Sequence, residues 1–266
     1  MSARLWNEGR LTDLEVEDDD ALYGLSGVSW ADLRGALADL RFCWPASEAE
    51  MPSAWEDLTR QSNLLNWHPA DTHELVRGVQ VGADELCHLA VHKVLFRVLG
   101  APEDWRSWLF AEAAASASDI LVLGALLRTR REAAFVPMQL EVLQVCWEDA
   151  GRDEDALHAA LVDLSDDPVR VWRDVVQLIE AHVTEQLELK DVRASAAAFA
   201  ARLSEPWGPL LLHFQTAWWV GALRDPARRR QENPLLPAIR QRLLEAEAPL
   251  AALVEERSGG DAMTGA

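Results

Sequence analysis

Histidines and carboxylates on one predicted helix are the first residues whose types and spacing could support chemistry. Asp84, Glu85, His88 and His92 fall within one stretch, and the two histidines are four residues apart. Side chains at this spacing share one face of a helix, and Asp84 lies one turn before His88. Such a face can supply two or three metal ligands. Alternatively, His92 and Asp84 are solvated and only one member of the group faces the core.

Two further histidines lie on apolar stretches. His182 shares an apolar stripe with Val175 and Ile179, and His213 lies in a segment that is apolar nearly all round. We therefore expect His213 to be buried. A buried imidazole costs free energy unless both ring nitrogens are used, and a metal ion on one with a hydrogen bond on the other is one solution. A structural hydrogen bond is the alternative for both histidines.

Arginines gather at two places. Arg128, Arg130 and Arg131 end an apolar helix just before Phe135. Cations there stabilise the helix dipole, but a guanidinium can also hold a substrate carboxylate through two parallel hydrogen bonds. The run 228–230 lies in a late loop and is either a second anion site or a solvated segment.

Several function classes lose their usual signals. The sequence contains no P-loop, GxGxxG, GxSxG or HExxH motif. Its formal net charge of -19 disfavours nucleic acid and anionic membranes as partners. Three cysteines lie far apart without a CxxC, which favours a reducing cytoplasm over a disulfide framework. The N-terminus has no apolar signal core, and 207–223 comes closest to a membrane span but contains His213 and Gln215.

Hydrophobic periodicity predicts the elements that position these side chains. The expected helices are 30–41, 53–61, 71–99, 105–130, 133–150, 153–163, 168–189, 191–203, 206–223 and 236–256. No segment alternates with a period of two. We therefore predict one all-α domain over 29–257, a bundle of long antiparallel helices, preceded by a flexible acidic arm (1–28) and followed by a disordered tail (258–266). Twelve tryptophans imply a ring-rich interior.

Short stretches between residues 70 and 145 resemble the tryptophan 2,3-dioxygenase family. In the family's order they are 73–75 with 83–86, the Leu-rich 119–128, and 134–139, where Phe135 and Gln139 match. Val81 takes the place of the family's distal histidine and Arg77 that of its pocket phenylalanine, and the family's Gly-Thr-Gly-Gly-Ser-Ser loop is absent. The chain is therefore similar to a divergent member of the wider group of histidine-ligated, heme-dependent aromatic oxygenases.

This resemblance implies an activity and roles for particular residues. Heme b would bind within an all-α bundle like that of the family, with its iron on His213 or His182 and with Phe135 and Gln139 in the pocket. His213 is slightly preferred, because a glycine, a loop and a last helix follow it as in the family. Arg128 would hold the carboxylate of a tryptophan- or tyrosine-type amino acid, and His88 would steer proton transfer.

The implied reaction inserts oxygen into the aromatic ring from dioxygen or peroxide, and the wider group includes enzymes of natural-product biosynthesis. The family also implies a homo-oligomer, with the N-terminal arm crossing to a neighbouring subunit.

Two other functions fit the same residues. A non-heme di-iron oxidase could use the carboxylates and histidines of a bundle core, here Glu85, His88, His92, Glu141 and His182. The Glu-x-x-His spacing that such sites use twice occurs here once, at Glu85 and His88. A non-catalytic helical protein would instead bind a partner through its acidic surface and tryptophan-rich grooves. An absorption spectrum separates these alternatives.

Overall fold

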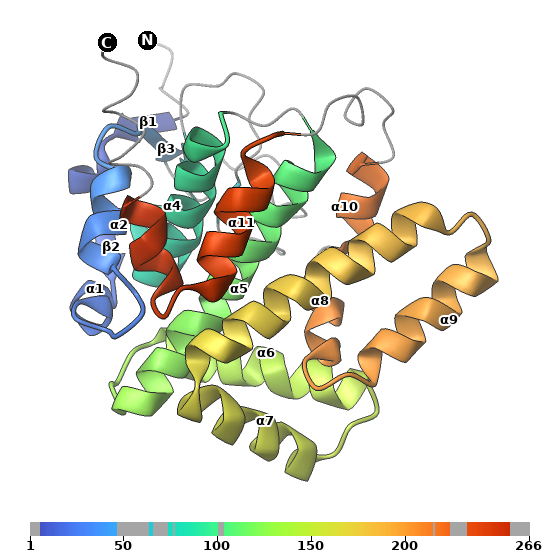
Figure 1. The fold of residues 1–266 in the computed structure, drawn as a ribbon. Helices are drawn as coiled ribbons and strands as arrows, with labels where there is room; N and C mark the ends of the chain where they lie inside the picture. Colours follow the sequence, from blue (N-terminus) through green and yellow to red (C-terminus); the bar gives the residue numbers. More distant parts are fainter. Residues whose placement is uncertain are drawn as a thin grey trace.

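The computed structural model describes residues 6–46, 64–65, 74–76, 78–100, 104–214, 216–223 and 233–255. These residues are mostly helical, which confirms the helical class, with short strands near the N-terminus (Figure 1). The principal helices are α4 (Ala83–Val98), α5 (Trp105–Thr129), α6 (Phe135–Asp149), α7 (Glu154–Asp166), α8 (Pro168–Glu188), α9 (Val192–Leu203), α10 (Thr216–Leu223) and α11 (Leu236–Glu245), with the 3-10 helix η3 (Gly208–Leu212) between α9 and α10.

Helix α5 is the centre of the molecule. It packs against α4 on one side and α8 on the other, and α7 and α6 lie beyond its C-terminal half (Figure 1). Asp104, Asp153, Asp167 and Asp191 begin α5, α7, α8 and α9, and each side chain accepts hydrogen bonds from backbone N–H groups of the first turn. The predicted helices over 105–203 are confirmed to within a few residues because periodicity and N-caps agree there.

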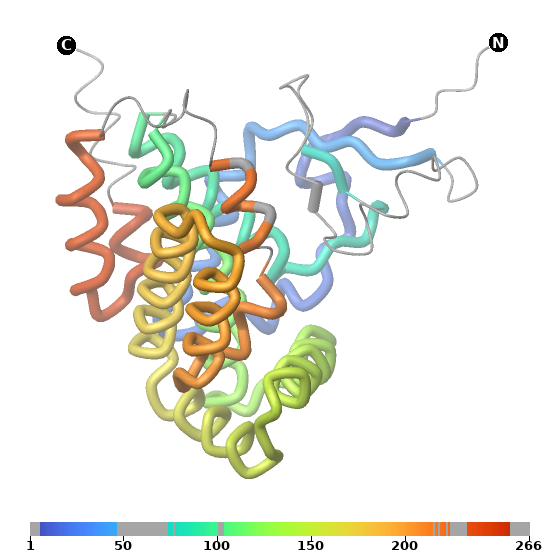
Figure 2. Tube along the Cα trace, turned by 90° about the vertical axis from the view of Figure 1, so that its right-hand side faces the viewer, coloured from blue at the N-terminus to red at the C-terminus, as the bar shows by residue number. Residues whose placement is uncertain are grey.

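The N-terminal part contains strands that were not predicted. The helices there are η1 (Leu11–Asp13), α1 (Asp19–Leu22) and α2 (Trp30–Ala36), and the strands are β1 (Trp6–Gly9), β2 (Glu15–Glu17), β3 (Phe42–Pro45), β4 (Leu64–Leu65), β5 (Glu74–Val76) and β6 (Gln80–Gly82). Four strands form a sheet in the order β1-β3-β5-β4, and β2 pairs with β6 in parallel. They gather on the side of the helical bundle away from α8 and α9 (Figure 2).

Four predicted helices were wrong in extent. The helix expected over 71–99 begins only at Ala83, because β5 and β6 precede it and pair with distant strands. The helix expected over 30–41 ends at Ala36, before β3. The segment 206–223 divides into η3 and α10, and α11 ends at Glu245 before a separate helical turn at 249–255. At the start of η3, the Gly208 backbone lies against the Arg202 carbonyl, where a side chain would not fit.

Residues 6–28 differ from the predicted flexible arm, because they pack onto the helices of their own chain. The Asp18 carboxylate accepts hydrogen bonds from the N–H groups of Ala134 and Phe135, both at 3.0 Å, at the start of α6. Arg131 donates to the carbonyls of Ala21 and Tyr23. Five apolar side chains of the segment are buried: Leu11, Leu14, Leu22, Leu25 and Val28. The predicted tail, the helix over 53–61 and residues 224–232 lie outside the described residues.

Helix α5 also replaces 207–223 as the segment most like a membrane span. Among the described residues it is the one helix long and apolar enough to cross a membrane. In this fold 89% of its most apolar stretch is buried inside the protein. Its composition is therefore accounted for by its central position.

Candidate functional site

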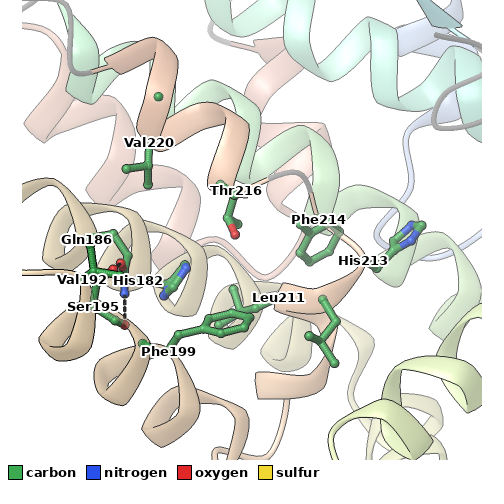
Figure 3. A pocket seen from close by; sticks show the side chains of 14 residues that line it. His182, Gln186, Val192, Ser195, Phe199, Leu211, His213, Phe214, Thr216 and Val220 are labelled. Atoms are coloured by element: carbon green, nitrogen blue, oxygen red, sulfur yellow. Dashed lines mark hydrogen bonds between the residues drawn. The ribbon is translucent and has the colours of Figure 1, made fainter. Parts of the chain in front are cut away.

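A cavity of about 900 Å³ lies between α8, α9, η3 and α10 (Figure 3). Its volume is near the upper end of the roughly 300–1,000 Å³ typical of small-molecule sites. Most of its lining is apolar, and the polar groups come from Gln186, Ser195, Thr216, His182 and His213. Both histidines that the sequence nominated as iron ligands therefore line the same cavity. No lining residue that the structure describes carries a formal charge.

His182 lies deep in this cavity, on α8. Its side chain is only 3% exposed, and its Nδ1 is buried without a hydrogen-bond partner. The ring contacts Phe199 with 5.3 Å between ring centroids. Burial, and then the charge of Arg202, lower the pKa of His182. The imidazole is therefore neutral at pH 7, which is the form that binds a metal ion.

The wall of the cavity opposite the core is formed by α9, a helix with no fully buried residue. The Gln186 side chain donates to the Ser195 carbonyl at 3.1 Å, and the Ser195 hydroxyl donates to the Gln186 side-chain oxygen. Arg202 of α9 also pairs with Glu185 of α8, with Nε and Oε2 3.1 Å apart. These contacts hold α9 against α8, where both helices line the cavity.

His213 occupies the exposed end of the cavity and is not buried as predicted. Figure 3 shows its ring beyond Phe214 and directed away from His182. Partial loss of hydration lowers the pKa of His213, and the nearby charge of Asp119 opposes this shift. The two histidines thus have different environments, and only His182 is enclosed.

A second polar group lies where α4 contacts α5, and we call it the α4–α5 seam: Asp84, His88, His92, Glu112 and Asp119. His88 Nδ1 is 3.3 Å from Asp119 Oδ2, and His92 Nε2 is 3.0 Å from Glu112 Oε1. The predicted single face of His88 and His92 therefore exists, with a carboxylate of α5 opposite each histidine. The sequence prediction did not include the two carboxylates, although two acids seven residues apart in an apolar helix were a usable signal.

Protonation in the seam is set by burial and by crowded negative charge. Burial lowers the pKa of His88, but Asp119, Glu112 and Asp84 together raise it above the usual value. Burial, assisted by the charges of Asp119 and Glu85, raises the pKa of Asp84 to about 8. At pH 7 the seam therefore holds a protonated Asp84, and the carboxylates of Asp119 and Glu112 favour the charged form of His88.

The remaining predicted site residues lie elsewhere. Arg128 is exposed at the end of α5, Phe135 is buried at the start of α6 and Gln139 is half-buried one turn later, and none of the three lines the cavity. Val81 is buried in β6. Arg77 and 228–230 lie outside the described residues.

The five proposed di-iron ligands do not come together. Glu141 is exposed on α6, whereas His88 and His92 are in the seam and His182 is in the cavity. Among the described residues, no group of three or more His, Cys, Asp or Glu side chains is arranged to hold a metal ion.

Comparison with known proteins identifies no relative. No protein-family model, curated protein or solved structure matches this chain. The chemistry of the cavity and of the seam is therefore inferred from their geometry.

Proposed function

We propose that this protein is a heme-dependent oxygenase that holds heme b in the cavity and acts on an aromatic amino acid of the tryptophan or tyrosine type. The observation that carries the proposal is the His182 imidazole, which is neutral, buried and unpartnered at Nδ1 in a large apolar cavity. Heme iron takes a neutral imidazole nitrogen as its axial ligand. The bound heme would supply the activation of dioxygen or peroxide, and the protein would orient the substrate and exclude water.

The lining of the cavity suits a flat, largely apolar group. Phe199, Leu211 and Phe214 offer apolar surface around His182 (Figure 3). The described lining carries no charged side chain, and His213 lies at its exposed end. His182 is therefore the preferred iron ligand in this proposal, and His213 is placed at the solvent end. Arg128 has no role here, because it does not line the cavity.

An absorption spectrum of protein expressed with a heme precursor tests the proposal. We expect a Soret band in the wild type and its loss in His182→Leu, which keeps the cavity apolar while removing the imidazole. His158→Ala is the matched control, because His158 is exposed on α7 and does not line the cavity. We expect L-tryptophan or L-tyrosine to shift the band of the wild type.

Two outcomes contradict the proposal. Protein that stays colourless and iron-free after addition of hemin has no heme site. A His182→Leu variant that binds heme as tightly as the wild type would show that another residue holds the iron. Circular dichroism of each variant separates loss of the ligand from loss of the fold.

A further inference from the structure

Helix α9 is the wall of the cavity that is least integrated into the core. It lies at the outer edge of the molecule beside α8 (Figure 1), and none of its residues is fully buried. The other walls belong to the core, because α8, η3 and α10 each contribute fully buried apolar side chains. Moving α8, η3 or α10 would therefore expose more apolar surface to water than moving α9.

The cavity leaves His182 covered. Its side chain is only 3% exposed, and the Phe199 ring of α9 lies against the imidazole with 5.3 Å between ring centroids. Figure 3 shows Phe199 extending from α9 toward His182. A ligand atom can therefore bond to this imidazole only after neighbouring side chains have moved.

A pair of side chains, which we call the latch, joins the first half of α9 to α8: Gln186 and Ser195. Gln186 Nε2 donates to the Ser195 carbonyl at 3.1 Å, and the Ser195 hydroxyl donates to Gln186 Oε1. Gln186 lies one helical turn after His182, so the latch is beside the imidazole (Figure 3). Both members of the latch also line the cavity.

The second half of α9 is anchored by contacts outside the latch. Arg202 Nε lies 3.1 Å from Glu185 Oε2, and the Arg152 guanidinium donates to the Ser204 carbonyl at 3.1 Å. The first half instead follows a short connection, 189–191, whose two end residues are extended. Short connections of this kind are where hinge motions occur, because a few residues absorb the change in backbone angles.

We propose that α9 is a lid of the cavity: when the Gln186–Ser195 latch opens, the first half of α9 swings away from α8 and carries Phe199 off the His182 ring. A planar, apolar ligand then reaches the imidazole, and the latch closes again to exclude water. The identity of this ligand as heme rests on the proposed function, but the motion itself does not require heme.

Chemical modification of His182 in the full chain without heme tests the lid. Diethyl pyrocarbonate acylates a neutral imidazole that it can reach, and His182 is neutral at pH 7. Mass spectrometry gives the acylation rate of His182 relative to that of His158, which is exposed on α7. We expect slow acylation of His182 in the wild type and an increase of about 3- to 10-fold in Ser195→Ala, the effect of losing one hydrogen bond of the latch.

Two controls separate lid opening from unfolding. Arg193→Ala changes an exposed residue of α9 that does not line the cavity, and it should leave the rate of His182 unchanged. Cys87, which is fully buried in α4, should stay unlabelled by maleimide over the same time in every variant.

The inference is overturned if Ser195→Ala acylates His182 at the wild-type rate. It is also overturned if His182 of the wild type reacts as fast as His158, because the imidazole is then accessible without any motion. Labelling of Cys87 together with His182 would attribute the reaction to global unfolding and would overturn the lid as well.

Hemin binding connects the lid to the proposed function. Stopped-flow measurement should show that Ser195→Ala takes up hemin faster than the wild type by the same factor as it is acylated, and an equal uptake rate would overturn the lid as the route of entry. Failure of both proteins to bind hemin would instead contradict the proposed function, and the acylation rates would still decide whether α9 opens.

Discussion

At the scale of single residues, Asp84 is the side chain whose charge the fold opposes most clearly. Its side chain lies on α4 and is only 6% exposed, and its pKa is about 8. An unfolded Asp has a pKa near 3.8. Between these two values the folded protein binds a proton that the unfolded chain releases. The contribution of Asp84 to stability is therefore complete below about pH 4 and is lost as the pH rises to about 8.

Asp84→Asn removes this cost, because the amide is neutral at every pH. Each unit of pKa shift corresponds to about 1.4 kcal/mol, so we expect a gain on the order of a few kcal/mol at pH 8.5 and a smaller gain at pH 5. Urea unfolding at the two pH values measures it. Asp166→Asn, on the exposed end of α7, is the control. A variant with the same pH dependence as the wild type would show that Asp84 ionises normally.

At the scale of elements, Gly124 determines how closely α5 crosses the junction of α7 and α8. A Cβ on Gly124 would lie 2.7 Å from Leu164 Cδ1 and 2.9 Å from both the Leu164 carbonyl and Pro168 Cβ. The backbone carbonyl cannot move away without shifting α7. The close approach of these helices therefore requires glycine in the middle of α5.

Gly124→Ala should destabilise the protein by about 1–3 kcal/mol, the usual cost of overpacking, despite the higher helix propensity of alanine. Gly35→Ala is the matched control, because Gly35 lies in α2 and a Cβ there meets no atom within 4 Å. We expect the control to be neutral or more stable by up to about 1 kcal/mol. Thermal unfolding compares them, and equal melting temperatures would contradict the close packing.

The elements that could be predicted are those whose signals are local. Helices α5 to α9 have apolar periodicity, and four of the helices have an aspartate N-cap. Strands β5 and β6 are three residues each and depend on partners elsewhere in the chain, so no local pattern distinguishes them from the start of a helix. The candidate functional residues were likewise predictable only where the signal was local.

The shared face of His88 and His92 follows from spacing alone. That His182 and His213 line one cavity does not, because α8, α9, η3 and α10 converge there only in the folded chain. The burial expected for His213 was wrong for a related reason: the segment around it is apolar but is not one continuous helix.

At the scale of the whole molecule, the N-terminal segment is part of the core. Its five buried side chains contribute roughly 1.5–3 kcal/mol each, which together is comparable to the total stability of a typical domain. Asp18 and Arg131 add hydrogen bonds that connect this segment to the start of α6 and the end of α5. The sequence did not reveal this role, because residues 1–28 are acidic and their buried leucines are spaced irregularly.

Deletion of residues 1–28 should therefore prevent cooperative folding. We expect the truncated protein to be insoluble or to lack a sharp thermal transition by circular dichroism. Deletion of residues 1–5, which removes none of the five buried side chains, is the control and should retain the transition. A truncated chain that unfolds cooperatively at the wild-type temperature would show that the segment is an independent arm.

The central position of α5 has a consequence for the order in which the chain is made. This helix is complete at residue 129, whereas α8, which covers one of its sides, begins only at Pro168. On the ribosome, the apolar helix α5, which is long enough to cross a bilayer, therefore emerges well before α8 can pack against it. During that time the exposed apolar surface of α5 is a binding site for chaperones that hold nascent chains. A chain truncated before α8 would expose the same surface and aggregate.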